Sequence, residues 1–208
     1  WELSSPGINE FSALDYVYVD ADVTLFQGQN QLNVKRIRKA DEGEYHPADY
    51  LPVTTKDIPA MQHELIQYIT TIKNEYLRKL ASGYFNDPEF MKAFSFHSAA
   101  KSVHHGFVGG LLEHTLSVVK MCDYFSKQYP LINRDLLLTA AMFHDIGKTK
   151  ELSAFPANDY TDDGQLLGHI IIGSQMVKER IDAMPGFPKK LESELIHCIL
   201  AHHGELEY

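Results

Sequence analysis

The sequence has 208 residues, with 19 Lys and Arg, 28 Asp and Glu, and a formal net charge of −9. This length allows one domain, or one domain with a small companion. A hydrophobic fraction of 44% excludes wholesale disorder, and no run reaches the roughly 18–20 apolar residues of a membrane span. The acidic balance argues against a protein that coats duplex nucleic acid, because such binding neutralises phosphates with basic residues. It permits an enzyme that holds one phosphate through metal ions.

The two cysteines, Cys122 and Cys198, cannot form a disulfide framework. Both lie in apolar stretches with helical periodicity, so we expect buried free thiols in a reducing cytoplasm. The sequence begins at Trp1 rather than Met, and its first residues read like the interior of a domain. We therefore expect it to be a fragment of a longer chain.

Residues 15–39 are rich in β-branched and aromatic side chains, and a turn at residues 27–30 divides them. This pattern predicts a β-hairpin. An isolated hairpin is marginally stable in water, so we expect it to belong to a larger sheet. Residues 40–58 are rich in turn-forming residues and are predicted to be a linker. The candidate inward-facing residues of the second strand are Leu32, Val34 and Ile37.

From Pro59 onward, apolar residues recur every three or four positions, which predicts amphipathic helices. Residues 154–164 are expected to form a polar loop. We therefore predict a mainly α fold, with residues 58–208 as a helical bundle and residues 1–57 as a partial β segment plus linker. The predicted helices cover residues 59–80, 87–94, 108–127, 133 to about 147, 166–183 and 189–203.

Four groups of histidines fall on successive helices of this bundle. A single helical histidine is more often a packed or capped residue than a metal ligand. Burying this many imidazoles without partners would cost roughly 1–3 kcal/mol each, whereas a divalent metal removes that cost, and bundle cores commonly hold such sites. The sequence therefore predicts a metal site built from His114, His144-Asp145, His169 and His202-His203.

The ligand set narrows the choice of metal. Imidazole and carboxylate without nearby thiolate suit Mn, Fe, Zn or Co better than a structural zinc site. A carboxylate has two oxygens and can bridge two cations, whereas one imidazole nitrogen normally serves one cation. We therefore place Asp145 between two metal ions.

These residues in this order resemble the HD-domain metal-dependent phosphohydrolases. The resemblance covers about residues 95–208 and includes the segment MFHDIGK at residues 142–148 and the later Gly168-His169 and His202-His203-Gly204. A closer similarity is to the YhaM-type 3′–5′ exoribonucleases, in which an OB-fold domain precedes the HD domain. It is carried by the segment from His104 to Thr115, by residues 151–153 and 166–170, and by residues 201–205. The resemblance implies that residues 1–57 contain the C-terminal part of an OB-fold-like nucleic-acid-binding domain.

The resemblance also implies the role of each ligand. His114, His144 and Asp145 would hold one metal ion, and Asp145, His169, His202 and His203 the other, with His203 alternatively a supporting or surface residue. A water or hydroxide between the ions would attack phosphorus. Mn²⁺ is the first expectation for both ions, with Fe, Co, Zn and Mg as alternatives. HD domains complete the site with a later Asp, which we expect beyond Tyr208.

Several basic residues are candidates for substrate contacts. Lys148, together with His104 and His105, is predicted to contact the substrate phosphate, and Lys148 and Asp145 are the candidate catalytic residues. The alternative for each of the three phosphate contacts is a solvated or loop position. OB-folds bind single strands through basic grooves and aromatic rings. The weaker candidates for nucleic-acid binding, for which a solvated strand face is the better interpretation, are Lys35, Arg36, Arg38 and Lys39.

The resulting hypothesis is a cytoplasmic, metal-dependent 3′–5′ exoribonuclease that releases nucleoside 5′-monophosphates from single-stranded RNA or DNA. The first alternative is an HD-type nucleotide phosphohydrolase or cyclic-nucleotide phosphodiesterase acting on small molecules. The second is a nucleic-acid-binding accessory protein with an inactive HD domain, against which the full set of histidines argues. No membrane partner is expected, and a homo-oligomer remains open.

Overall fold

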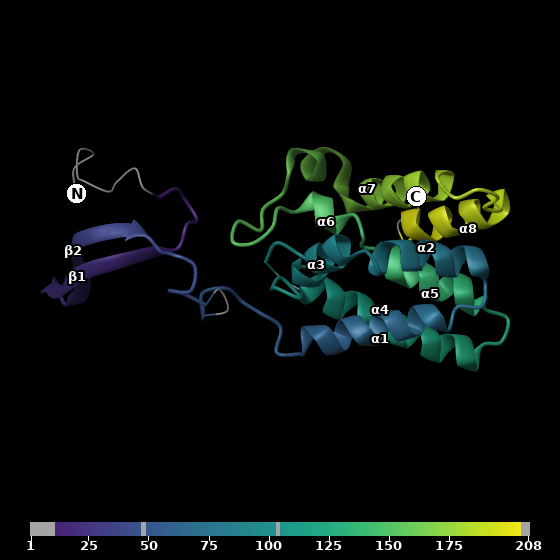
Figure 1. The fold of residues 1–208 in the computed structure, drawn as a ribbon, viewed down its shortest axis with the longest axis horizontal. Helices are drawn as coiled ribbons and strands as arrows, with labels where there is room; N and C mark the ends of the chain where they lie inside the picture. Colours follow the sequence, from purple (N-terminus) through teal and green to yellow (C-terminus); the bar gives the residue numbers. More distant parts are fainter. Residues whose placement is uncertain (1–10, 47–48, 103–104, 205–208) are drawn as a thin grey trace. The chain divides into compact units, whose positions relative to one another are not determined.

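The computed structural model describes residues 11–46, 49–102 and 105–204. The chain divides into two units, Trp1–Tyr50 and Leu51–Tyr208, which are described separately. The first contains a two-stranded antiparallel sheet, and the second contains the helices (Figure 1). The predicted mainly α fold with a β segment near the N-terminus is therefore confirmed. In the part of the chain that the structure describes, no helix combines the length and apolar character needed to cross a bilayer.

The hairpin of the first unit consists of β1 (Val17–Phe26) and β2 (Gln29–Lys39). Gln27 and Gly28 connect the strands, and both have positive φ, 51° and 79°. Two central residues with positive φ give the turn a twist that matches the twist of the paired strands. The hairpin predicted over residues 15–39 is thus present.

A β-bulge changes which side chains share a face of this hairpin. Val19 lies opposite Ile37, but Ala21 lies opposite Val34, so Lys35 is left out of the register. The bulge places Leu32, Val34 and Ile37 on one face, although Leu32 is 60% exposed and does not face inward as predicted. Simple alternation would also have put Lys35 beside Ile37. The bulge instead lets Lys35 pair with Asp22.

The helical unit begins with α1 (Ile58–Thr70) and α2 (Glu75–Phe85), where the sequence predicted one helix over residues 59–80. That prediction was wrong because Asn74 interrupts the periodic pattern. The Asn74 side chain accepts hydrogen bonds from the backbone N–H groups of Tyr76 and Leu77, which starts a new helix. Asp135 accepts from the backbone N–H groups of Lys73 and Asn74 and so holds the break in place.

Four of the remaining predicted helices begin within two residues of the predicted position, but those predicted to end near residues 147 and 203 end at Phe143 and Leu200, and the short helix Lys148–Glu151 was not predicted. The fifth predicted helix differs most. That helix begins at Asp162 rather than at the predicted residue 166. The Thr161 side chain caps its start by accepting a hydrogen bond from the backbone N–H of Gly164. Gly168 has φ 71° and ψ 162°, so the helix is broken immediately before His169. The elements are α3 (Pro88–Phe96), α4 (Gly110–Gln128), α5 (Arg134–Phe143), the short α6 (Lys148–Glu151), α7 (Asp162–Asp182) and α8 (Lys189–Leu200).

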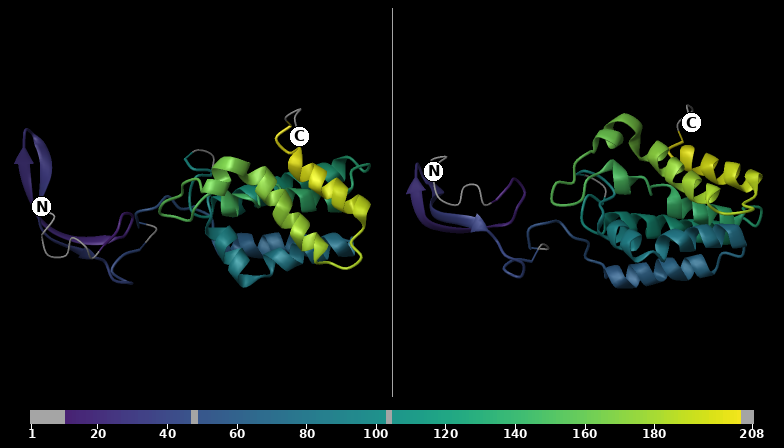
Figure 2. Two further views of the ribbon diagram at one scale, coloured as in Figure 1. Left: turned by 90° about the horizontal axis from the view of Figure 1, so that it is seen from above. Right: turned by 45° about the horizontal axis from the view of Figure 1, so that its top comes forward.

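The core of the helical unit fixes the segment that carries His144 and Asp145. Phe143 is fully buried and packs against Phe85, with ring centroids 5.7 Å apart, and Ile146 is also fully buried. These two side chains anchor the backbone on both sides of the His-Asp pair. The helices α7 and α8 lie side by side in both views of Figure 2, and they bring the later histidines to the same region.

Candidate metal centre

The first group of candidate ligands comes from the start of α4 and the end of α5. His114 Nε2 lies 3.1 Å from His144 Nε2 and 3.4 Å from Asp145 Oδ2, and His144 Nε2 lies 3.3 Å from the same oxygen. Ligand atoms about 2.0–2.1 Å from one ion are separated by roughly 3.0–3.4 Å from each other. The three atoms are therefore spaced as ligands of a common ion would be.

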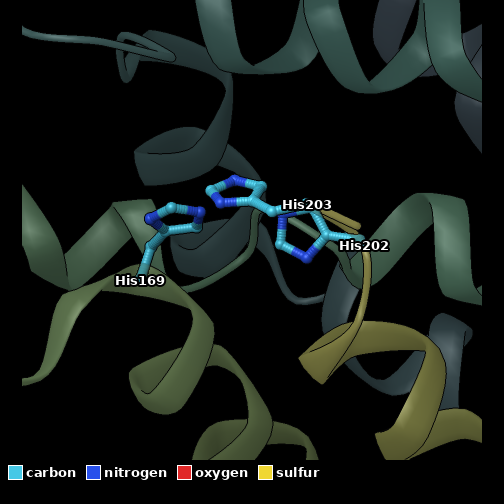
Figure 3. Close-up of side chains that lie close together, drawn as sticks. All are labelled: His169, His202 and His203. Carbon is cyan, nitrogen blue, oxygen red and sulfur yellow. The ribbon is translucent and has the colours of Figure 1, made fainter. Parts of the chain in front are cut away.

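The second group comes from α7 and from the turn after α8. The rings of His169, His202 and His203 face one another in Figure 3, and one ligand atom from each lies within 4.8 Å of the others. The Nε2 atoms of His169 and His202 are buried and make no hydrogen bond among the described residues. A buried imidazole nitrogen without a partner is costly. A metal ion would provide that partner, so the donor set fits a cation.

Asp145 stands between the two groups and offers a different oxygen to each. Its Oδ2 faces His114 and His144, while its Oδ1 lies 3.4 Å from His169 Nε2 and 3.7 Å from His202 Nε2. The side chain is only 3% exposed. Burial alone would raise the pKa of Asp145, but the rings of His144 and His202 and the charge of Lys148 hold that pKa well below its usual range. The carboxylate is therefore ionised at neutral pH.

Backbone carbonyls set the orientation of two of the rings. His144 Nδ1 donates to the carbonyl of Ala141 at 2.8 Å, and His202 Nδ1 donates to the carbonyl of Ile199 at 2.7 Å. Each histidine thus uses the carbonyl three residues earlier, at the C-terminal end of its helix. When Nδ1 carries the proton in a neutral ring, Nε2 is left as the acceptor. In that tautomer each Nε2 atom has the lone pair that binding a cation requires.

The orientation of the His169 ring is set by a buried carboxylate instead of a backbone carbonyl. Glu151 Oε1 accepts from His169 Nδ1 at 3.0 Å and from the His169 backbone N–H at 3.0 Å. The backbone N–H is available because Gly168 breaks α7 at this point. Glu151 was given no role from the sequence, although residues 151–153 are among the segments that resemble the YhaM-type exoribonucleases. That similarity and the short distance along the chain from the His-Asp pair were the signals, whereas the pairing with residue 169 depends on the tertiary fold.

The pKa of His114 supports its assignment to a cation site. Burial lowers the pKa of His114 to about 4, and the attraction of Asp145 offsets this only in part. The ring is therefore neutral near pH 7 and carries a lone pair. Burial, followed by the neighbouring His202 and His169, also lowers the pKa of His203.

Known proteins are similar to this chain both over its C-terminal part and over its whole length. Residues 111–208 match the HD domain family. The chain is 34% identical to the 3′-5′ exoribonuclease YhaM of Bacillus velezensis over 212 residues, which covers 100% of this chain and 66% of that relative. This chain is an HD-domain, YhaM-like protein. It spans just under two thirds of the length of that relative. No solved structure matches it significantly.

Within the HD domain, Lys148 lies against the shared aspartate. Its Nζ is 3.0 Å from Asp145 Oδ2 and donates to the carbonyl of Ala99 at 2.7 Å. His105 lies beside the centre, with its ring centroid 5.5 Å from that of His114. His104, the third predicted phosphate contact, lies outside the described residues.

Glu113 precedes His114 and connects the HD domain to the segment that enters it. It accepts from Thr54 Oγ1 at 2.5 Å and lies 3.0 Å from Lys56 Nζ. Burial would raise the pKa of Glu113, but these two contacts lower it overall. Glu113 is therefore ionised and anchors residues 54–56 at the start of α4.

The weak nucleic-acid candidates lie on β2, in the first unit. Three of the four make ion pairs within that unit: Lys35 with Asp22 at 2.6 Å, Arg38 with Glu44 at 2.6 Å and Lys39 with Asp15 at 2.7 Å. Arg36 lies opposite Asp20 in the strand register. These acidic neighbours reduce the positive field that a nucleic-acid groove requires, so the solvated strand face remains the better interpretation.

Proposed function

We propose that this chain belongs to a metal-dependent 3′–5′ exoribonuclease that hydrolyses single-stranded RNA to nucleoside 5′-monophosphates. The observation that carries the proposal is the position of Asp145, whose two oxygens face two separate groups of histidines. The relationship to an exoribonuclease supports RNA as the substrate. A cytoplasmic location, single-stranded DNA as a second substrate and an OB-fold-like origin for residues 1–57 belong to the same proposal.

In this proposal two divalent ions, Mn²⁺ first, occupy the centre. His114, His144 and Asp145 hold one ion, and Asp145, His169, His202 and His203 hold the other. When bound, such a pair supplies Lewis-acid activation of water and neutralises charge on phosphate oxygens. The protein contributes fixed ring orientations through Ala141, Ile199 and Glu151, so that the ligands are positioned before substrate enters.

Lys148 acts as a positioning residue and as a contact for the substrate phosphate. Its ammonium group fixes Asp145 Oδ2 and places a positive charge beside the ligand cluster. We expect Lys148→Ala to reduce turnover by about tenfold to a hundredfold, the range typical for groups that support a metal ligand. Ions should still bind this variant, as calorimetry with Mn²⁺ would show. Unchanged kinetics would place Lys148 outside the reaction.

Product analysis tests the proposal directly. Single-stranded RNA labelled at its 5′ end is incubated with the protein and Mn²⁺, and the products are separated by length. A ladder that shortens with time, together with release of nucleoside 5′-monophosphates, supports 3′–5′ exonuclease action. Intact RNA combined with hydrolysis of nucleotides or cyclic nucleotides would instead support the small-molecule phosphohydrolase.

A further inference from the structure

A cavity of about 520 Å³ extends from the candidate metal centre into the space between α4, α5 and α8. At one end it is lined by candidate ligands and Lys148. At the other end its walls are uncharged. Small-molecule sites usually have volumes of about 300–1,000 Å³, so this cavity is large enough for one. Its uncharged walls are formed by Val118, Cys122, Leu137, Ala140, Ala141 and Cys198.

Helical periodicity explains why these side chains line one continuous space with the ligands. On α4, Val118 and Cys122 follow His114 at intervals of four residues. On α8, Cys198 precedes His202 by four residues. Residues four apart lie one above the other on a helix, and eight residues span about 12 Å. The uncharged stripe on each helix therefore leads away from the ligand on that helix.

The two ends of the cavity suit the two ends of a nucleotide. The candidate metal ligands and Lys148 would hold a phosphate at one end, and the other end offers apolar surface to the flat faces of an aromatic base. We propose that the uncharged part of the cavity binds the base of the 3′-terminal nucleotide while its 5′ phosphate lies at the candidate metal centre. This inference rests on the proposed exonuclease function and adds a subsite to it.

The composition of the cavity walls predicts how strongly the subsite discriminates between the four bases. Among the described residues that form the uncharged walls, hydrogen-bonding side-chain groups are limited to the weakly bonding thiols of Cys122 and Cys198. Strong discrimination between bases requires polar groups that pair with their edges. We therefore expect the four common nucleoside 5′-monophosphates to bind within about threefold of one another, as suits an enzyme that removes residues irrespective of sequence.

The test compares adenosine 5′-monophosphate with ribose 5-phosphate, which lacks only the base. Binding to the full chain is measured by calorimetry in the presence of Mn²⁺. The wild type should bind the nucleotide at least tenfold more tightly than the sugar phosphate. Cys122→Phe, which fills the cavity, should remove this preference and leave the affinity for ribose 5-phosphate within twofold. Met121→Phe is the matched control, because Met121 is 60% exposed on the same helix and lies outside the cavity lining.

The outcomes separate this inference from the proposed function. Equal binding of the two phosphates to the wild type, or a preference that survives in Cys122→Phe, would overturn the base subsite alone. If neither phosphate binds, the phosphate is not held at the histidines and both proposals fail.

A second measurement on the wild type does not depend on a variant that folds. Cys122 and Cys198 are free, partly buried thiols that line the proposed subsite. Adenosine 5′-monophosphate with Mn²⁺ should slow their alkylation by N-ethylmaleimide at least fivefold, as followed by peptide mass spectrometry. Ribose 5-phosphate should give less than twofold protection. Equal rates with and without the nucleotide would contradict the proposal.

Discussion

At the scale of single residues, the centre depends on groups that orient the histidines as much as on the histidines themselves. His144 and His202 use backbone carbonyls that no substitution can remove, but His169 relies on the side chain of Glu151. Glu151 is buried, and its carboxylate contacts both the ring and the backbone of His169. Glu151 is therefore the orienting group that mutation can test.

We expect Glu151→Ala to weaken Mn²⁺ binding by about 10–100-fold, the usual effect of removing a carboxylate that orients a ligating histidine. Glu151→Gln should recover part of the affinity, because its amide oxygen still accepts from Nδ1. Calorimetric titration with Mn²⁺ measures both variants. Glu179→Ala, an exposed position on α7, is the control and should bind like the wild type. Equal affinity in all four proteins would show that Glu151 does not orient a ligand.

Asp145 is the residue whose loss should affect both groups of ligands. Asp145→Ala removes both oxygens, so we expect loss of Mn²⁺ binding and of RNA hydrolysis by more than a hundredfold. The far-ultraviolet circular dichroism spectrum should remain helical, because Phe143 and Ile146 still anchor the backbone. Hydrolysis at the wild-type rate would end the proposal that the two groups share this aspartate.

Much of the centre at this scale could be predicted from the sequence. His114, the His144-Asp145 pair, His169 and His202-His203 lie together in space, and their positions on successive helices of the predicted bundle suggested it. Their assignment as ligands stays a prediction. Glu151 and the carbonyl of Ala99 could not be found in this way, because their partners are defined by packing between distant segments.

At the scale of elements, close backbone packing joins the His-Asp segment to α7. A Cβ atom placed on Gly147 would lie 2.0 Å from the carbonyl oxygen of His169 and 2.6 Å from the backbone nitrogen of Gly173. Neither backbone atom can move without moving α7. The absence of a side chain at position 147 therefore determines how close His169 comes to Asp145.

We expect Gly147→Ala to push α7 outward and carry His169 away from Asp145. Mn²⁺ affinity should fall at least tenfold, and thermal denaturation should show a loss of roughly 1–3 kcal/mol, as is typical of overpacking. Gly43→Ala is a useful comparison, because nothing lies within 4 Å of the added Cβ, although its positive φ adds some strain. It should leave Mn²⁺ binding unchanged. Wild-type Mn²⁺ affinity in Gly147→Ala would contradict this account.

Ion pairs of the buried Asp123 carboxylate brace α4 against α5 away from the centre. Asp123 accepts from Arg134 Nε at 2.8 Å and lies 2.6 Å from Lys127 Nζ, and Arg134 also donates to Thr71 Oγ1. Burial would raise the pKa of Asp123, but Lys127 and Arg134 lower it below its ordinary value of 3.8. The stabilisation is therefore complete above that pH and is lost as the pH falls through the folded-state pKa.

We expect Asp123→Asn to lower the free energy of unfolding by about 1–3 kcal/mol at pH 7, the range for hydrogen bonds to charged groups. Urea denaturation at pH 7 and near pH 3 provides the measurement. The difference between variant and wild type should shrink at the lower pH, because the Asp123 carboxylate of the unfolded chain, with its ordinary pKa of 3.8, is then largely protonated. A difference that is constant with pH would show that the charge of Asp123 is not responsible.

At the scale of the whole molecule, we expect the helical unit to bind the terminal nucleotide and the first unit to contribute to the binding of longer RNA. We expect a protein lacking residues 1–50 to keep its affinity for adenosine 5′-monophosphate, because Thr54 and Lys56, which anchor the start of α4, remain. Binding of a single-stranded RNA of 20 nucleotides should weaken by about tenfold or more, the contribution of one stacked base. Fluorescence anisotropy measures the RNA affinity. Equal RNA affinity would favour the small-molecule phosphohydrolase.

The fold class and the order of the main elements were predictable from the sequence. The positions at which helices and strands are interrupted were less so. Apolar spacing continues from Met61 to Leu80 and conceals the interruption at Asn74, which depends on the distant Asp135. The kink at Gly168 is similarly hidden, since a glycine within a helical pattern does not reveal its φ angle. The bulge in β2 shifted Lys35 for the same reason, because a strand pattern does not show an extra residue.

The carbonyl anchors of His144 and His202 have a consequence for how quickly ions load. Because these rings are already held in the orientation that a cation needs, entry requires little rearrangement of the protein. The slow step should then be the removal of water from the incoming ion. Mg²⁺ gives up its hydration shell reluctantly. We therefore expect Mn²⁺ to load the metal-free protein faster than Mg²⁺, whatever their final affinities.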